Sequence, residues 1–509
     1  MDMKTVLSYE WGAMMPEFII LGTAILLSLF DLFAPKRFNR RPLAWFALIG
    51  IVLAFVSLIS LLPLAETSIL ADTFRLDSFA KASKLLLLIG AGLVIVLAAS
   101  HSANDGLGGY QGEFYYLFLT ALLGAMMMTS SGDLITLVVG LELLSISSYI
   151  LAGMKKKNLK SNEAALKYVV MGGISTAITL FGMSYLYGLT GSTNLGEMSE
   201  TMARVSDSQV LYLLGLAFFM VLVGLSFKLA TAPFHMWAPD VYEGAPTPVT
   251  AFLSVISKIA GFVILLRLLL SLFLAASGDT FGTVAFLEQN RVFIAVLAGA
   301  TMIIGNVLAL RQQNVKRLLA YSGIAHAGYL LVAVATLGGG YFLLDTVWFY
   351  FLAYLFMNIG AFAVFQWLAD ANSSEQRFIF VGLAKRSPAA AVAMTIFLLS
   401  LAGIPGTAGF IGKFHIFLGA LLGSTPTDYI LASILLATTI LSYVYYFSLL
   451  VQIFFRPAAT KEAVRFPVSL MIVLLVCVVG TMIFGLAPNI ALDFLHQHFG
   501  DFTDFISMG

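Results

Sequence analysis

The sequence predicts an all-α polytopic membrane protein with about fourteen transmembrane helices. Of its 509 residues, 60% are hydrophobic and only 11% are charged, whereas soluble domains carry about 25% charged residues. Apolar runs of about 20 residues, the length that crosses a bilayer as a helix, recur along the whole chain. Two of these runs are interrupted by Pro233 and Pro405, and proline breaks or kinks a regular helix.

The predicted spans follow one another with short connections between them. They cover residues 14–34, 42–64, 79–100, 113–130, 133–153, 164–189, 209–232, 248–272, 291–310, 316–337, 342–369, 388–424, 428–454 and 466–489. The run 388–424 is counted as one broken span. The first run lacks the basic segment and cleavage site of a signal peptide, so it is interpreted as a retained span.

Lysines and arginines concentrate in alternate connections. If every run crosses once, one side carries Lys36, Arg37, Arg40, Arg41, Lys155, Lys156, Lys157, Lys160, Arg311, Lys316, Arg317, Arg377, Lys385, Arg386, Arg456, Lys461 and Arg465. The other side carries only Lys4, Arg75, Lys81, Lys84, Arg204 and Arg291. The positive-inside rule makes the first side cytoplasmic, so both termini are expected on the outer side.

The two broken spans, numbers seven and twelve, lie five spans apart. Spans four and nine start from opposite sides, which predicts two inverted five-helix repeats at residues 113–272 and 291–454. Residues 1–110 form an N-terminal three-helix extension in this interpretation, and residues 466–509 form a C-terminal helix and tail. All four segments belong to one membrane domain.

Several classes of function are excluded. The net charge is +1 with no basic tail, which argues against nucleic-acid binding. The single cysteine, Cys477, cannot form an intrachain disulfide or a cysteine-ligated cluster. The sequence holds no glycine-rich phosphate loop, metal-ligand constellation or nucleophile triad, so no metal, cofactor-binding or catalytic redox residue is expected in this chain.

Isolated ionisable residues inside the spans are the candidate functional groups. Glu142, Lys228, Lys258 and Lys413 lie deep in apolar runs. A charge at the centre of a spanning helix costs about 2.5–3.5 kcal/mol even on gentle insertion scales, so each needs a function or a partner. Glu142 and Lys228 are expected to form a pair whose separation would make the lysine easier to deprotonate.

Each candidate also has a structural interpretation. Glu142 and Lys228 could be a static pair that fixes helix register. Lys413, beside a break, could neutralise the negative end of a half-helix. His326 could be a neutral, hydrogen-bonded core histidine rather than part of a relay.

Other charges lie nearer the ends of their spans. Lys167 and Arg267 are expected to reach the surface along their aliphatic stems. Glu17 and Asp345 are expected to be interfacial.

The stretch from Phe227 to Pro248 carries a family resemblance. It reads Phe-Lys-Leu-Ala-Thr-Ala-Pro-Phe-His-Met-Trp-Ala-Pro-Asp-Val-Tyr-Glu-Gly-Ala-Pro-Thr-Pro. A second run, Ala-Phe-Leu-Ser-Val-Ile-Ser-Lys, begins at Ala251 and ends at Lys258. With Ser-Asn-Glu-Ala-Ala-Leu-Lys-Tyr ending at Tyr168 and Gly-Leu-Thr-Gly ending at Gly191, it resembles the antiporter-like membrane subunits of respiratory complex I. The resemblance covers spans four to thirteen.

The resemblance implies a proton-translocating membrane-arm subunit of an NADH–quinone oxidoreductase. In such a subunit Glu142, Lys228, Lys258, Lys413 and His326 would relay protons, driven by electron transfer elsewhere. The chain would be a non-redox part of this translocase, and flavin, iron–sulfur clusters and quinone would belong to partner subunits. The expected partners are other membrane-arm subunits, including further antiporter-like ones, and the lipid bilayer of a bacterial plasma membrane.

Two other functions remain to be weighed. A subunit of a multisubunit sodium/proton antiporter would share the fold and the lysines, although the Val-Tyr-Glu-Gly run ending at Gly244 favours the redox complex. A solute carrier would need a roomy polar site at half-helix N-termini. The sequence instead places single charges on several helices.

Overall fold

The computed structural model describes residues 8–35, 39–100, 110–205, 207–276, 285–336, 343–423, 425–457, 467–500 and 502–506. Five basic residues used to predict the topology lie outside these ranges: Lys4, Lys36, Arg37, Lys461 and Arg465.

Thirteen helices in the described residues are long and apolar enough to cross a membrane. They are α2 (Met15–Phe33), α3 (Leu43–Ser60), α4 (Ser78–Ala99), α5 (Gln111–Thr129), α6 (Leu134–Ala152), α7 (Leu159–Thr190), α9 (Ser208–Leu229), α11 (Thr247–Leu268), α12 (Phe286–Ala309), α13 (Val315–Ala335), α14 (Leu343–Asn372), α18 (Pro426–Phe454) and α19 (Val468–Leu486). Two shorter apolar helices, α16 (Pro388–Ala402) and α17 (Ala408–Leu422), together form the predicted broken span. The predicted all-α membrane fold is therefore confirmed.

The remaining elements are short. They are η1 (Trp11–Met14), β1 (Thr67–Ile69), β2 (Phe74–Leu76), α8 (Leu195–Ala203), α10 (Trp237–Gly244), η2 (Leu269–Phe273), η4 (Arg377–Phe380), α15 (Leu383–Arg386), α20 (Asn489–Phe499) and α21 (Thr503–Ile506). The two strands pair as a small antiparallel hairpin, which the sequence did not predict.

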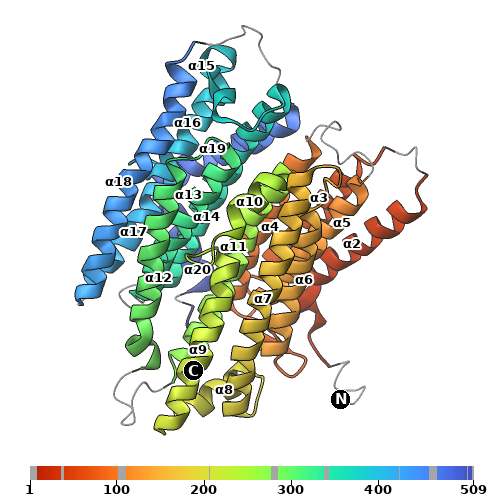
Figure 1. The fold of residues 1–509 in the computed structure, drawn as a ribbon. Helices are drawn as coiled ribbons and strands as arrows, with labels where there is room; N and C mark the ends of the chain where they lie inside the picture. The colour runs from red at the N-terminus through yellow and green to blue at the C-terminus, as the bar shows by residue number, and fades with distance from the viewer. Residues whose placement is uncertain are drawn as a thin grey trace.

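Helix α11 lies at the centre of the molecule. Figure 1 shows α2 to α7 gathered on one side and α12 to α18 on the other, with α11 between them. Every residue of α11 is buried, and α13 and α14 are buried almost all round. Because a helix that is apolar on all sides needs neighbours on all sides, the polar side chains of these three helices face protein rather than lipid.

The seventh span is broken where the prolines predict. Helix α9 ends at Leu229, and Ala230 adopts a left-handed conformation with φ 57°. Leu229 is the residue whose carbonyl would bond to the N–H that Pro233 lacks. The short helix α10 then continues toward the end of the molecule opposite the start of α9 (Figure 1).

The twelfth span is broken between α16 and α17. Gly403 and Gly406 have φ of +83° and +90°, a conformation that glycine adopts without steric cost. Pro405 lies between them, so the predicted break is confirmed at this position.

The two ends of the described chain lie on the same side of the molecule (Figure 1). Asp504 of α21 accepts hydrogen bonds from the backbone N–H and the hydroxyl of Ser78, at the start of α4. Near the other terminus, Ala13 packs with Phe74 of the hairpin. A chain that crosses a membrane an even number of times has both termini on the same side.

Candidate functional site

Lys228 lies in the last turn of α9, directly before the break. Its side chain is buried, and Nζ donates a hydrogen bond of 3.1 Å to the hydroxyl of Ser145 on α6. A cation in the last turn also faces the unsatisfied carbonyl groups of its own helix. The break in the seventh span therefore sets an ammonium group inside the protein at the end of a half-helix.

Glu142 is not in direct contact with Lys228. Its Oε1 accepts a 2.7 Å hydrogen bond from Thr176 on α7, and within the described chain no ion pair of 4.0 Å or less joins it to Lys228. A cavity of about 10 Å³ is lined by Ser145, Thr176 and Lys228. That is about the volume that one water molecule needs. The predicted pair is therefore not a direct contact in the described residues.

Lys258 lies in the middle of α11 and is buried. Its ammonium donates a hydrogen bond to the carbonyl oxygen of Gly323 on α13 and lies 5.8 Å from the ring centroid of Tyr354 on α14. One turn further along α11, a Cβ atom at Gly261 would lie 3.3 Å from Cγ of Lys228. The side chain of Lys228 therefore packs against α11 one turn away from Lys258.

His326 lies on α13 within a cluster of hydroxyl groups. Its Nδ1 is 2.6 Å from the hydroxyl of Tyr350, and its Nε2 is 3.4 Å from that of Tyr446. The hydroxyl of Tyr446 is in turn 2.5 Å from that of Ser322. In such a chain each hydrogen bond polarises and strengthens the next. The ring of Tyr354, which faces Lys258, is 5.2 Å from the imidazole centroid, so the cluster adjoins the central lysine.

Lys413 is buried in α17, just after the second break. Its Nζ donates to the carbonyl oxygens of Leu401 and Ala402, at 2.8 and 3.2 Å, at the end of α16. It also lies 4.8 Å from the ring centroid of Tyr329, which is one turn from His326 on α13. This position suits neutralisation of a half-helix end as well as a relay role.

These groups follow one another through neighbouring contacts, and we call the succession the buried line. Lys228 and Lys258 come from the first predicted repeat and His326 and Lys413 from the second, and all four side chains are buried. Glu142, at the start of the line, is half-buried. The sequence identified these charged residues, whereas the tyrosines that connect them were missed, because aromatic residues in an apolar run resemble ordinary core packing.

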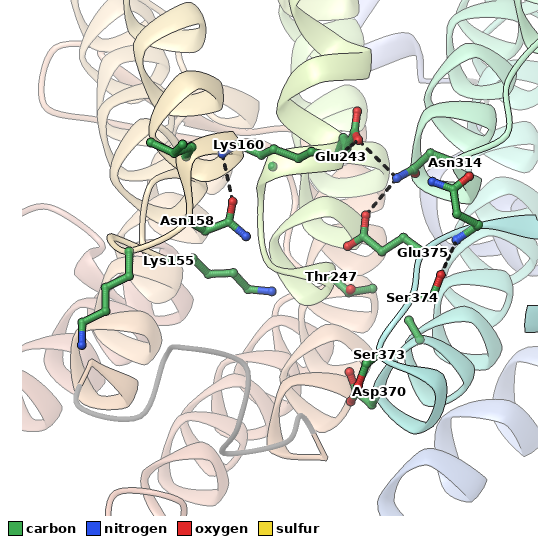
Figure 2. A pocket seen from close by; sticks show the side chains of 15 residues that line it. Lys155, Asn158, Lys160, Glu243, Thr247, Asn314, Asp370, Ser373, Ser374 and Glu375 are labelled. Carbon is green, nitrogen blue, oxygen red and sulfur yellow. Dashed lines mark hydrogen bonds and ion pairs between the residues drawn. The ribbon is translucent and has the colours of Figure 1, made fainter.

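A cleft of about 840 Å³ opens at the end of the molecule that carries the predicted basic connections. Figure 2 shows Lys155 and Lys160 on one wall, Glu375 on the other and Thr247 between them. Thr247 is the first residue of α11, so the cleft reaches the start of the central helix.

An ion pair fixes one wall of this cleft. Lys316 at the start of α13 lies 2.6 Å from Glu375. Burial alone would raise the pKa of Glu375, but the charge of Lys316 and the hydrogen bonds from Lys316 and Asn314 outweigh it, so the pKa lies below its usual range.

The short helix α10 is held by cations from both predicted repeats. Asp240 pairs with Lys167 of α7 at 2.6 Å and with Arg317 of α13 at 2.5 Å. Glu243 pairs with Lys160 of α7 at 2.6 Å and with Arg317 at 3.1 Å. Lys167 reaches the surface as expected, although its ammonium is paired there.

Two buried ion pairs near the outer ends of the helices correct the sequence interpretation. Arg267, expected at the surface, is fully buried and lies 2.9 Å from Asp77. Glu17, expected to be interfacial, is buried and lies 2.6 Å from Lys84. Lys84 was counted with a connection but belongs to α4. Asp77, which caps α4 by accepting from the N–H of Ala80, is the helix-start signal that places Lys84 about two turns inside the helix.

Comparisons with known proteins cover the whole chain. Residues 131–442 match the family described as NADH:quinone oxidoreductase/Mrp antiporter, TM. NADH-quinone oxidoreductase subunit N of Anoxybacillus flavithermus is 60% identical over 504 residues, which is 99% of this chain and 100% of that protein. The protein of the same name from Bacillus anthracis is 55% identical over 511 residues, covering 100% of this chain and 99% of that one.

Solved structures show the same architecture. A chain of respiratory complex I from Thermus thermophilus is similar with a TM-score of 0.76 and 31% identity, over 94% of this chain and 99% of that one. A chain of an archaeal membrane-bound sulfane sulfur reductase has a TM-score of 0.83 over 97% of this chain and 99% of its own length. At 22% identity the second likeness concerns the fold alone.

Proposed function

This chain belongs to the family of NADH:quinone oxidoreductase and Mrp antiporter membrane subunits, and we propose that it is a proton-translocating subunit, of the subunit N type, in the membrane arm of a bacterial complex I. The identity of 60% to a subunit N along nearly its full length supports this role. Its partners are the other subunits of that complex, and its location is the bacterial plasma membrane. We propose that both termini lie on the outer side, which the positive-inside rule favours.

The observation that carries the proposal is the buried line from Lys228 to Lys413. A proton held near Glu142 and Thr176 would reach Lys228 through the small cavity that Thr176 and Lys228 line, then Lys258, the tyrosine and histidine cluster, and Lys413. Moving one proton against 100 mV takes about 2.3 kcal/mol. A hundredfold change in the proton affinity of one relay lysine supplies about 2.8 kcal/mol, because each tenfold step is about 1.4 kcal/mol.

Electron transfer takes place in other subunits under this proposal. The sequence offers no motif for flavin, an iron–sulfur cluster or nucleotide, which supports a role as a translocase component without a redox centre of its own. Flavin, clusters and quinone would be held by partner subunits, and the energy would arrive through the membrane arm.

The alternative is a subunit of a multisubunit sodium/proton antiporter, which the same family description includes. Relatives that share 53–60% identity along nearly the whole chain are named subunit N of NADH-quinone oxidoreductase, which favours the redox complex. Purification in mild detergent separates the two. Iron–sulfur absorbance in the co-purified complex supports the proposal, and a colourless complex that confers sodium resistance supports the antiporter.

The direct test is Lys258→Ala in the native complex. Electron flow and proton translocation are measured on the same membranes, with the exposed Lys385→Ala as control. We expect proton translocation to fall at least about tenfold, which is a barrier increase of about 1.4 kcal/mol, while the control pumps normally. Unchanged translocation in Lys258→Ala would overturn the proposal.

A further inference from the structure

We propose that Thr247, Thr250 and Ser254 of α11, with Asn358 of α14 as a positioning residue, form the route by which protons enter from the cleft and reach Lys258. This inference rests on the proposed function and adds an entry that does not pass through Glu142 and Lys228. It depends on the geometry of one helix face, one contact between helices and one open cleft.

The hydroxyl groups of α11 lie on the same face as Lys258. Thr247, Thr250, Ser254 and Lys258 follow the spacing that places residues on one side of a helix, within about 80° at 100° per residue. All four side chains are buried. Successive members are about one turn, or 5.4 Å of rise, apart, a gap that a single water molecule can bridge.

The end of this face at Thr247 opens into the cleft. Thr247 lines the cleft between its two walls (Figure 2). The opposing charges of Lys160 and Glu375 flank it. Aqueous protons can therefore reach the first turn of α11, and from there Lys258 is about 16 Å away along the helix at 1.5 Å per residue.

Asn358 connects this face with the next helix. Its amide nitrogen donates a 2.9 Å hydrogen bond to the hydroxyl of Ser254, whose own proton points to the carbonyl of Ala251 at 2.8 Å. A buried serine in a spanning helix is ordinarily satisfied by its own backbone alone. The added bond from α14 occupies a lone pair of Ser254 and fixes the orientation of its hydroxyl.

Tyr354 lies where the route reaches Lys258. It lies one turn from Asn358 on the same face of α14, and its hydroxyl is buried with no hydrogen-bond partner in the described residues. A Cβ atom at Gly323 would lie 2.8 Å from Nζ of Lys258 and 2.9 Å from this hydroxyl. Glycine therefore leaves room beside both polar groups at the point where the route meets the lysine.

The transfer conserves protons at each step. A neutral Lys258 amine accepts one proton and becomes an ammonium group. Each hydroxyl on the route releases one proton toward Lys258 and takes one from the side of the cleft, so it returns to its starting state. Asn358 neither gains nor loses a proton.

The test uses the whole complex in inverted membrane vesicles, where the cleft side faces the buffer. The variants are Thr250→Val and Ser254→Ala, and Ser254→Thr serves as the conservative replacement that keeps a hydroxyl. Thr481→Val is the control for loss of a buried hydroxyl, because Thr481 is equally buried and donates to the carbonyl of Cys477, four residues earlier. Thr250 donates likewise to Pro246, four residues earlier, and also to Tyr242 of α10 at 3.0 Å. NADH oxidation, proton uptake into the vesicles and retention of the subunit are measured at several buffer pH values.

We expect proton uptake in Thr250→Val and Ser254→Ala to slow about tenfold, equal to a barrier increase of about 1.4 kcal/mol, with a deficit that grows as the buffer pH rises. Ser254→Thr and Thr481→Val should pump normally. Normal pumping by Thr250→Val and Ser254→Ala at high pH, or a loss that is equal at every pH, would overturn the route. Lys258→Ala is measured in parallel. If Lys258→Ala alone loses pumping, the route is wrong and the proposed function stands. If Lys258→Ala pumps normally, the proposed function itself is wrong.

Discussion

Lys228 donates its hydrogen bond to Ser145, while Glu142, three residues earlier on the same helix, is held by Thr176 of α7. The acid and the lysine are thus each bonded to a hydroxyl group, and Ser145, Thr176 and Lys228 line a cavity of about 10 Å³. A direct ion pair would hold its proton tightly in a medium of low dielectric constant. Under the proposed function, the two groups would exchange a proton through a water molecule in this cavity.

Glu142→Gln should remove most proton translocation by the complex, because the amide keeps a hydrogen bond to Thr176 but cannot take up and release a proton. Proton uptake and NADH oxidation are measured in the same vesicles. Glu163→Gln is the control, since Glu163 is an exposed acid on α7 that pairs with Lys167 at 2.6 Å. A Glu142→Gln complex that pumps as well as this control would contradict the relay.

Gly323→Ala should weaken pumping and also lower the stability of the subunit. The new methyl group would lie 2.8 Å from Nζ of Lys258 and 2.9 Å from the hydroxyl of Tyr354, so both flexible ends must move. Overpacking of this kind costs about 1–3 kcal/mol. Gly173→Ala is the matched control, because a Cβ atom there meets nothing within 4 Å. Equal pumping by the two variants would show that the spacing at Lys258 is unimportant.

Asp77→Ala should destabilise the subunit by about 3–5 kcal/mol, because it leaves the buried Arg267 without its counter-charge. The loss should appear as a lower temperature at which the subunit dissociates from the purified complex. Asp77 also caps α4, which adds to the effect.

The double variant Asp77→Leu with Arg267→Leu separates these contributions, since removing both charges costs less than removing one. The exposed pair of Arg204 and Glu200, 4.0 Å apart with side chains 82% and 74% exposed, provides the comparison. Glu200→Ala should change the dissociation temperature very little, because exposed pairs contribute about 0–1 kcal/mol. An Asp77→Ala complex as stable as Glu200→Ala would refute the assignment.

The ion pair of Glu375 with Lys316 should make the stability of the complex depend on pH. Its pKa is lowered in the folded chain, with burial opposed by the stronger effect of Lys316. A carboxyl with a lowered pKa stabilises the fold above its unfolded value of about 4.3, and this contribution is lost as the pH falls through the folded value. The stability difference between wild type and Glu375→Gln should therefore be constant near neutral pH and vanish in acid. A difference that persisted in acid would count against the ion pair, and Glu200→Gln is the control.

The fold could be predicted from the sequence because a bilayer imposes its thickness on every apolar run. The breaks at Pro233 and Pro405 were predictable for a comparable reason, since proline cannot continue a helix. The lone charges of Lys228, Lys258 and Lys413 were also visible, because their neighbours in sequence are apolar. The two inverted repeats remain a prediction.

The partners of these charges could not be predicted. Ser145 rather than Glu142 receives the bond of Lys228, because the choice depends on how far α6 is rotated about its axis. Tyr354 and Tyr446 give no sequence signal, since burial of an aromatic ring is the ordinary case. Glu17 and Lys84 meet across 67 residues of sequence only because α2 and α4 pack into the same bundle.

His326→Gln tests whether the imidazole carries a proton or only fills the core. Glutamine can hydrogen-bond to Tyr350, as His326 does at 2.6 Å, but it cannot be protonated near neutral pH. A relay role therefore predicts a complex that assembles and oxidises NADH but translocates fewer protons. A packing role predicts normal translocation, because the hydrogen bond survives. His498→Gln, on the exposed surface of α20, is the control for loss of a histidine, and both variants are measured in vesicles at matched subunit content.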